Sequence, residues 1–259
     1  MPDAFPLPEL AAVDERGQGV VLGVFGSWTP SLELALPIAE RVRVALMRAS
    51  DSRVPWQICG KDEHGRPRRG HEHLYVLPFS SAGGARIDRV LLWADKGLED
   101  STLAVVERLA DRGGWVQLRG RERLRLELLG VGAPEVIAPT VPRGVLGPAR
   151  IWRSATSFVP PRFTKVRGGR VIDTAQEQVL RLASEVLGLA PVGISALERE
   201  DGEWRGFRQR RVKDPRSPRR AAGGWVLRFS APVRGPVVLG YGAHYGLGRF
   251  EAEPGDERR

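Results

Sequence analysis

The segment Gly19 to Ser27 reads G-V-V-L-G-V-F-G-S, a short apolar run bounded by glycines. Such a run predicts a buried strand. Residues Ser31 to Ser50 follow it and predict an amphipathic helix, with Pro37 near its start as a point at which the helix can kink. The apolar residues that recur there at helical spacing are Leu32, Leu36, Ala39, Val42 and Leu46.

The rest of the first half continues this series of elements. After a polar loop at Lys61 to Gly70, two strand-like runs, His71 to Phe79 and Ile87 to Trp93, are separated by a turn signal. Leu98 to Arg112 predicts a second helix, and the alternating charged and apolar residues of Arg121 to Leu129 predict a half-buried strand. The order strand, helix, strand, strand, helix, strand is that of the ferredoxin-like fold.

A second series follows residues 134–148, which four prolines mark as a linker. The predicted elements are a strand at Ala149 to Val159, a helix at Thr174 to Leu187, strands at Arg205 to Val212 and Trp225 to Ala231, and a closing run at Leu247 to Glu251. We expect a Gly-rich segment to replace one helix of this unit. The sequence therefore predicts an α+β protein with tandem ferredoxin-like domains, at residues 1–133 and 149–259.

The charge is unevenly distributed. The net charge of +9 divides into −2 over residues 1–110 and +11 over residues 111–259, and nearly all of the basic residues are arginine. A GC-rich genome explains much of the preference for arginine over lysine, but it does not explain why one half is cationic. The planar guanidinium pairs with phosphate and stacks on bases, so this distribution favours nucleic-acid binding.

Other features of the sequence exclude several classes of protein. The start of the chain lacks the pattern of a signal peptide, and no apolar run approaches the roughly 20 residues that span a bilayer. The single cysteine, Cys59, excludes an internal disulfide and fits a reducing cytoplasm. We therefore expect a soluble, cytoplasmic protein that does not contact membranes.

Three of the four histidines lie in one segment, K-D-E-H-G-R-P-R-R-G-H-E-H. If His71 opens a strand, His71 and His73 point to the same face. Two imidazoles beside Arg66, Arg68 and Arg69 would suit acid–base cleavage of RNA, with one ring taking the proton of a ribose 2′-OH. The other ring, or a nearby group, would protonate the leaving 5′ oxygen, and an arginine would stabilise the phosphorane.

Two other interpretations of this segment stay open. Two histidines on one face, with Asp62 and Glu63 nearby, could form a metal site, although no third ligand stands out at a telling spacing. Alternatively, one histidine packs under the sheet and the other contacts solvent or a phosphate. Our prediction is acid–base chemistry without a metal or another cofactor.

The Gly-rich segment Gly235 to Phe250 reads G-P-V-V-L-G-Y-G-A-H-Y-G-L-G-R-F. Its glycine spacing and the strand predicted after it exclude a dinucleotide-binding loop. Closely spaced glycines let backbone N–H groups approach phosphates, and Tyr245 and Arg249 would then stack on and pair with RNA. His244 is a further catalytic candidate. The alternative is a tight connection with buried tyrosines.

Two other stretches carry cations. The run from Arg205 to Arg220 holds eight basic side chains against one acid, which favours phosphate binding over a merely solvated loop. A second stretch, I-W-R-S-A-T-S-F-V-P-P-R-F-T-K, interleaves cations with aromatics that could equally be core residues. The RNA-binding candidates from these two stretches are Arg205, Arg208, Arg210, Arg211 and Lys213, together with Arg153, Arg162 and Lys165.

Four motifs in order resemble one family. G-H-E-H-L-Y-V-L-P, R-I-D-R-V-L-L-W-A, W-R-S-A-T-S-F-V-P-P-R-F and the Gly-rich segment are similar to CRISPR repeat-processing endoribonucleases of the RAMP superfamily, type I-G (formerly I-U) variety. The resemblance runs from about Ser31 to Phe250. It corresponds to the nuclease half of members that are commonly longer fusions with a further N-terminal RAMP unit.

The resemblance implies two RRM/RAMP-type ferredoxin-like domains, the second with a Gly-rich loop. It also implies metal-independent cleavage of CRISPR precursor RNA in or beside the repeat stem, which leaves a 2′,3′-cyclic phosphate. The expected partners are CRISPR repeat RNA, the guide RNA made from it, and other subunits of a type I effector complex. Two rival functions remain: a RAMP subunit that binds guide RNA without cutting it, and a metal-dependent nuclease.

Overall fold

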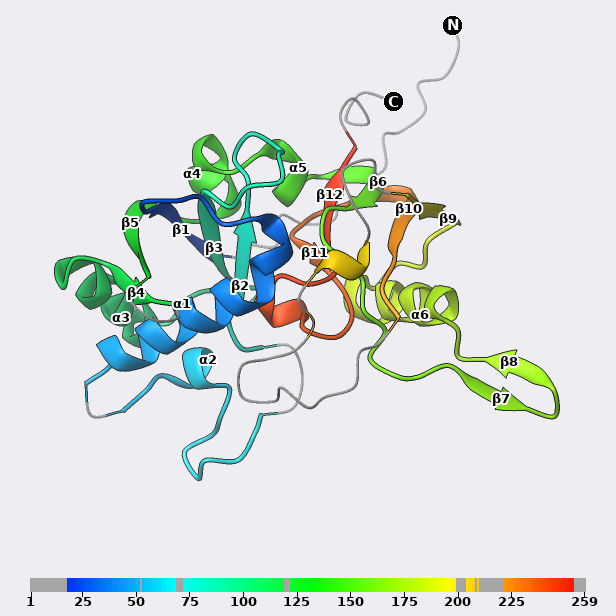
Figure 1. Ribbon diagram of the computed structural model, residues 1–259, viewed down its shortest axis with the longest axis horizontal. Coiled ribbons are helices and arrows are strands. Elements are labelled where there is room, and N and C mark those ends of the chain that lie inside the picture. The colour runs from blue at the N-terminus through cyan, green and yellow to red at the C-terminus, as the bar shows by residue number, and fades with distance from the viewer. Residues whose placement is uncertain are drawn as a thin grey trace, which may run out of the picture.

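The computed structural model describes residues 18–51, 53–68, 72–118, 122–198, 204–207, 209 and 221–253. These residues form two five-stranded antiparallel sheets, each with its own helices, that lie next to each other (Figure 1). Within these ranges, no helix combines the length and the apolar character that a membrane crossing requires.

The first sheet has the strand order β2-β3-β1-β5-β4. β1 lies in the middle and pairs antiparallel with both β3 and β5, so the order without the edge strand β4 is that of the ferredoxin-like fold. The element order predicted for the first unit is confirmed. Its elements are β1 (Gln18–Phe25), η1 (Leu32–Leu34), α1 (Ala35–Ala49), α2 (Trp56–Cys59), β2 (Tyr75–Phe79), β3 (Arg89–Ala94), α3 (Asp100–Asp111), β4 (Trp115–Gln117) and β5 (Arg123–Gly132).

The helices α1 and α3 cover one face of this sheet. The apolar stripe of α1 packs against the alternate residues of β1 that point the same way, such as Val20 and Leu22, in one buried cluster with Leu36 and Val106. Pro37 lies in the first turn of α1, where its missing N–H removes no hydrogen bond within the helix. The predicted kink at Pro37 is therefore not required.

Residues 134–148 are folded against the first sheet, although their prolines predicted a linker. They form α4 (Pro134–Ile137), η2 (Ala138–Thr140) and α5 (Arg143–Leu146). Ile137 and Val145 are fully buried against the face of the sheet that α1 leaves open. Pro134 is the first residue of α4, a position that suits its fixed φ. The prolines here begin short helices as well as separating two domains.

The second sheet has the order β11-β12-β6-β10-β9. Without β11, this is the ferredoxin-like order a second time, so the prediction of tandem ferredoxin-like domains is confirmed. Between β11 and β12 stands only one turn of 3₁₀ helix, η4. The elements are β6 (Ala149–Ser154), β7 (Lys165–Arg167), β8 (Arg170–Ile172), α6 (Ala175–Leu187), β9 (Gly193–Leu197), η3 (Trp204–Gly206), β10 (Gly224–Val233), β11 (Val237–Val238), η4 (Ala243–Tyr245) and β12 (Arg249–Ala252).

One strand of the second unit was predicted at the wrong place. The sequence predicted it at Arg205 to Val212, of which residues 208 and 210–212 lie outside the described residues, whereas the strand after α6 is β9. The start of the predicted stretch is the 3₁₀ helix η3, and Phe207 after it is buried in the core of the first domain. Residues 204–207 therefore contact the first domain, and β9 takes the predicted strand's place in the second sheet.

Candidate active site

Two of the predicted catalytic histidines, His73 and His244, stack against each other between the two domains. His73 lies just before β2 of the first domain, and His244 is the middle residue of η4 in the second. Their ring centroids are 3.5 Å apart and their planes are inclined by 16°. Both side chains are partly exposed. The third predicted histidine, His71, lies outside the described residues.

Tyr75 stacks on the other face of His244. Its ring centroid lies 4.1 Å from that of His244 at an interplanar angle of 18°. The rings of His73 and Tyr75 would clash with each other if both lay on the same face of His244. They therefore lie on opposite faces and hold the imidazole between them. Burial raises the pKa of the Tyr75 hydroxyl, and the negative charge of Asp95 raises it further. The hydroxyl therefore stays neutral, and the contact of Tyr75 with the site is made by its ring.

Arg43 of α1 brings a fixed positive charge to the same region. Its Nε donates a hydrogen bond to the carbonyl oxygen of Ile58 at 2.6 Å, and its Nη2 donates to the carbonyl oxygen of Cys59. Its Nη1 donates to the hydroxyl of Tyr245, the residue after His244. Arg43 thereby ties α1 and the end of α2 to the second domain.

Gly60 lies close to both His73 and Arg43. It ends α2 with φ +69°, in the left-handed region that favours glycine. A Cβ at this position would lie 3.7 Å from the ring of His73 and 3.8 Å from Nη2 of Arg43. The imidazole and the guanidinium therefore approach the same point of the backbone. We refer to His73, His244, Arg43 and Tyr245 as the interdomain site.

The glycines around η4 allow the second domain to approach the first. Gly242 and Gly246 flank η4 with φ of +75° and +78°. A Cβ on Gly246 would lie 2.8 Å from Cδ of Pro78 in β2, and one on Gly242 would lie 3.3 Å from Leu36 in α1. The absence of side chains there is what lets His244 reach His73.

The amides of this segment are largely used within the protein. The N–H groups of Tyr245 and Leu247 donate to the carbonyl of Gly242, and that of Gly248 donates to Ser157. The expectation that these amides approach phosphates is therefore not supported. The burial of Tyr245 and the hydrogen bonds of these amides to other protein groups agree instead with the alternative, a tight connection.

Arg249 and Tyr245 lie in the interior rather than on a surface that RNA could reach. The Arg249 side chain is 1% exposed and its Nη1 donates to the carboxylate of Glu251. Its backbone N–H also bonds Thr156 at 2.9 Å. This environment differs from the RNA contact predicted for Arg249, because its guanidinium is buried and paired within the second domain. Tyr245, predicted to stack on RNA, instead holds Arg43.

The other predicted cations have different surroundings. Arg66 and Arg68 are exposed on the loop that leads to His73, and the guanidinium of Arg68 lies 4.0 Å from the ring centroid of Trp56. Arg153 pairs with Glu253 at 2.8 Å. Arg162, Lys165 and Arg205 are exposed. The candidates that fall outside the described residues are Arg69, Arg208, Arg210, Arg211 and Lys213.

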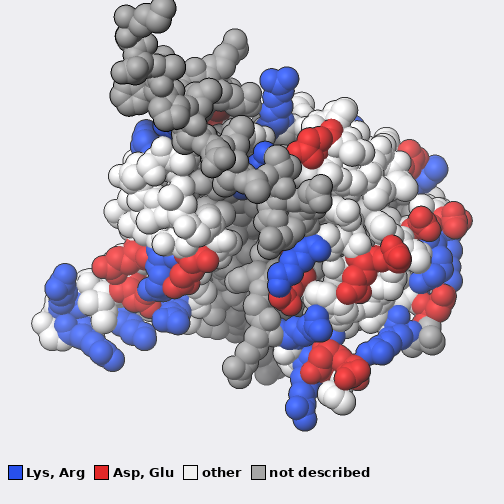
Figure 2. All heavy atoms as spheres, turned by 180° about the vertical axis from the view of Figure 1, so that it is seen from behind, with Lys and Arg blue, Asp and Glu red and all other residues white. Residues whose placement is uncertain are grey.

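A cationic hairpin that the sequence did not predict lies beyond Arg162. β7 and β8 form a two-stranded ribbon that projects from the second domain, with exposed Lys165, Arg167 and Arg170 (Figure 1). Figure 2 shows blue side chains along this projection at its lower left. The short strands carry little apolar alternation, which is why sequence periodicity missed them.

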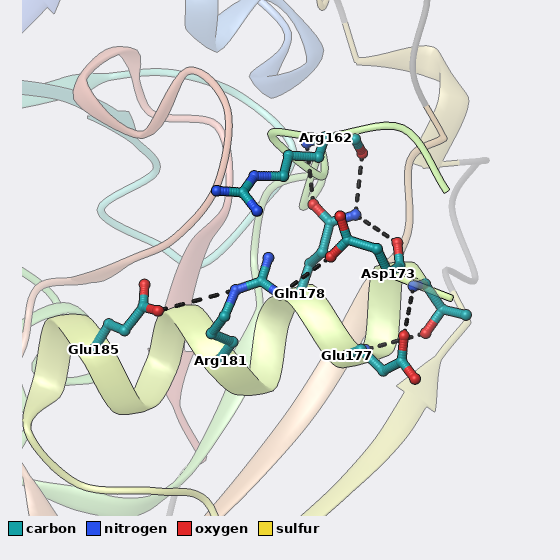
Figure 3. Close-up of polar contacts among 7 residues, drawn as sticks. Arg162, Asp173, Glu177, Gln178, Arg181 and Glu185 are labelled. Atoms are coloured by element: carbon teal, nitrogen blue, oxygen red, sulfur yellow. Dashed lines mark hydrogen bonds and ion pairs between the residues drawn. The ribbon is translucent and has the colours of Figure 1, made fainter. Parts of the chain in front are cut away.

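Gln178 of α6 holds the chain that enters and leaves this hairpin. Its amide accepts a hydrogen bond from the backbone N–H of Arg162 and donates to the carbonyls of Arg162 and Asp173 (Figure 3). Arg181 on the next turn pairs with the Asp173 carboxylate at 3.1 Å. The buried Gln178 side chain therefore fixes both ends of the hairpin to α6.

We expect Gln178→Leu to lower the free energy of unfolding by about 1–3 kcal/mol, because it leaves the Arg162 amide without its protein partner. Urea denaturation measures this loss. The matched control is Glu185→Gln on the same helix, which removes only an exposed pair with Arg181 at 3.9 Å and should change stability by less than about 0.5 kcal/mol. Equal losses in the two variants would contradict the role given to Gln178.

The carboxylates near His73 that a metal site would require already have partners within the protein. The Asp62 carboxylate accepts hydrogen bonds from the backbone N–H groups of His64 and Arg66, and Glu63 lies beside His64. Glu72 bonds Lys96, whose hydrogen bond and charge lower the pKa of that carboxyl. In the described ranges, no three His, Cys, Asp or Glu residues form a group that could hold a metal ion.

Arg43 of the interdomain site and Tyr75, which stacks on His244, are residues that the sequence analysis did not single out. Arg43 appeared only as a polar position of a predicted helix, and Tyr75 only as a residue of a predicted strand. The signal that could have indicated Tyr75 is its spacing, because it lies two residues after His73 and shares its face. No local pattern distinguishes Arg43 from the other arginines of α1.

Comparison with known proteins gives matches of fold only. No protein-family model and no curated protein matches this chain. Among solved structures, it is similar to "Csf5, CRISPR-Cas type IV Cas6 crRNA endonuclease" at 12% identity and a TM-score of 0.44, over 92% of this chain and 99% of that chain. The product of a Cas6-related gene from Pyrococcus furiosus matches at 13% identity and a TM-score of 0.43, over 92% and 99%. "An RAMP protein binding different RNA substrates" matches at 12% identity and a TM-score of 0.40, over 91% and 98%.

Proposed function

We propose that this protein is an endoribonuclease that cuts CRISPR precursor RNA within or beside the repeat stem without a metal ion. The observation that carries the proposal is the contact of His73 with His244 at 3.5 Å, with Arg43 held nearby. The cationic second half of the chain favours RNA as the substrate. The resemblance of the four sequence motifs supplies the kind of RNA.

The reaction uses the ribose of the substrate as the nucleophile. One imidazole removes the proton of the 2′-OH, the 2′ oxygen attacks the adjacent phosphorus, and the bond between phosphorus and the 5′ oxygen breaks. The other imidazole gives its proton to that 5′ oxygen. The products are one RNA ending in a 2′,3′-cyclic phosphate and one beginning with a 5′-OH.

The stacked geometry suits this division of labour. Two positively charged rings in contact would repel each other, so the reaction requires a pair with one neutral and one protonated imidazole rather than two charged ones. The neutral ring can accept a proton and the charged ring can donate one. Which of His73 and His244 takes each part depends on the position of the RNA.

Arg43 is suited to stabilise the negative charge that develops on the non-bridging oxygens of the phosphorane. Three of the five N–H donors of its guanidinium are used by Ile58, Cys59 and Tyr245, which fix its position before the substrate arrives. Removing one such preorganised donor from an enzyme typically costs roughly 10²–10³-fold in rate.

The proposal is tested with labelled CRISPR repeat RNA and purified protein, with and without EDTA, followed by mapping of the RNA ends. We expect cleavage at equal rates in both conditions and a 2′,3′-cyclic phosphate at the new end. Loss of cleavage in EDTA would indicate a metal-dependent nuclease. Binding without cleavage in either condition would identify the non-cutting RNA-binding subunit.

The hairpin makes a separate prediction about RNA affinity. Replacing Lys165, Arg167 and Arg170 together with glutamine should weaken RNA binding and reduce its salt dependence, because each lost phosphate contact lowers the slope of log K against log salt by roughly 0.7–0.9. Cleavage of RNA at saturating protein should change little. The same measurement applies to Arg208, Arg210 and Arg211. An unchanged salt slope would show that the hairpin is only a solvated projection.

A further inference from the structure

A second cluster of cations lies on the far side of α1 from Arg43. Arg41 and Arg43 are two residues apart, which separates them by about 200° around the helix. Arg41 lines a pocket of about 280 Å³ between α1, α3 and the β4–β5 edge of the first sheet. The polar and aromatic residues that line this arginine–tryptophan pocket are Arg41, Arg48, Arg112, Trp115, Gln117 and Arg123.

The charge of this pocket is largely unneutralised. Of its four arginines, only Arg112 has an acidic neighbour in the part of the chain that the structure describes, Asp51 at 3.9 Å. Arg112 also donates to the carbonyl of Arg48 at 3.4 Å. Among the described residues, those that line the pocket include no acid. Several like charges around one concavity attract an anion, because their potentials add and the walls exclude part of the solvent.

Trp115 adds an aromatic surface to the cations. Its side chain is 46% exposed, and the guanidinium of Arg123 lies 4.2 Å from its ring centroid. Nucleic-acid bases stack on an exposed indole, and the guanidinium over one face of the Trp115 ring adds a positive charge to the surface that a base and its phosphate would contact.

We propose that the arginine–tryptophan pocket binds a nucleotide of single-stranded RNA, with its base stacked on Trp115 and its phosphate held by Arg48 and Arg123. The pocket lies near the small end of the roughly 300–1,000 Å³ range of ligand pockets, a size that admits one flat group. A stable protein partner would need about 1,000 Å² of complementary surface, so RNA fits this concavity better.

This inference rests on the proposed function for the identity of the strand. RNA held at the interdomain site would reach the pocket by crossing α1, a helix about 10–12 Å across with its side chains. The nucleotide would then belong to the single-stranded flank of the cleaved RNA. The pocket would act as an exosite that adds affinity without touching the scissile phosphate.

The test measures the affinity of an uncleavable RNA, with a 2′-deoxy nucleotide at the cut position, that carries a single-stranded 5′ flank, a 3′ flank or neither. We expect Trp115→Ala to weaken binding of one flanked RNA by roughly 5- to 100-fold. It should leave the RNA without flanks unaffected. Trp115→Phe should retain most of the affinity, because phenylalanine also stacks.

A pair of charge-matched variants isolates the arginines. Arg48→Gln with Arg123→Gln should lower both the affinity for the same flanked RNA and the salt slope of its binding. Arg86→Gln with Arg150→Gln removes the same charge from exposed positions outside the pocket and should change the affinity less. Equal effects of the two pairs would overturn the proposal.

The remaining outcomes are also decisive. Wild-type affinity of Trp115→Ala for all three RNAs would overturn the proposal, as would an equal loss for the RNA without flanks. If the pocket variants bind an acidic peptide more weakly than the wild-type protein does, while their RNA affinity is unchanged, the pocket would be assigned to a protein partner instead. Failure of the proposed function would show separately, as the absence of cleavage by the wild-type protein.

Discussion

Replacing His73 or His244 with alanine is expected to slow cleavage of repeat RNA by roughly 10²–10⁴-fold, the usual contribution of a positioned proton-transfer group. RNA affinity should change little, because the cations that would bind the strand lie elsewhere. Single-turnover cleavage with excess protein separates the two effects. The two rings are in contact and act on one reaction, so the double variant should be hardly slower than the single variants.

His64→Ala is the matched control for these variants. Its side chain is 69% exposed and lies 3.6 Å from Glu63, which makes it a histidine of the same loop without a place in the interdomain site. It should cleave at the wild-type rate. Wild-type rates in both His73→Ala and His244→Ala would contradict the assignment. A lowered melting temperature with unchanged cleavage would show that the stacked rings only pack.

The fold could be predicted where apolar periodicity is strong. β1 is an apolar run buried on both faces, and the helices α1, α3 and α6 each bury one stripe against a sheet, so their patterns are visible in the sequence. β9 escaped prediction because its five residues, G-I-S-A-L, are half exposed and do not alternate. The wrong strand at Arg205 to Val212 contains Phe207, whose apolar side chain serves the other domain.

The candidate site could be predicted only in part. The segment with three histidines indicated His73, and the Gly-rich segment indicated His244. Their contact depends on how the two domains pack, and no local pattern in the sequence encodes that distance. The same holds for Arg43, because its three hydrogen bonds reach Ile58, Cys59 and Tyr245. A separate first domain would lack His244, so the interdomain site requires both units.

The glycines of the second domain illustrate the same limit. Their spacing indicated a close approach of the backbone to a ligand, whereas the structure shows a close approach to the protein itself. Gly242 and Gly246 meet α1 and β2 of the first domain, and Gly248 meets the chain beside β11. Glycine spacing identifies a crowded backbone, but it does not identify what crowds it.

Gly248→Ala is therefore expected to destabilise the protein by more than about 4 kcal/mol, a loss reserved for severe packing or backbone conflicts. Gly248 has φ +62°, and a Cβ there would lie 1.8 Å from the carbonyl oxygen of Leu239. Leu239 and Gly248 are also joined by a hydrogen bond of 2.8 Å, so the clash separates the strands on either side of η4. Urea denaturation measures the effect, and cleavage should fall as well because His244 lies on this connection.

Gly168→Ala provides the control that separates the clash from backbone strain. Gly168 has φ +55° in the β7–β8 turn, and no atom lies within 4 Å of a Cβ built there. Its replacement should cost only the left-handed penalty, about 1–2 kcal/mol, and should leave cleavage unchanged. Equal losses of stability in the two variants would mean that left-handed strain alone accounts for both. The close contact of Gly248 with Leu239 would then not be what holds His244 against His73.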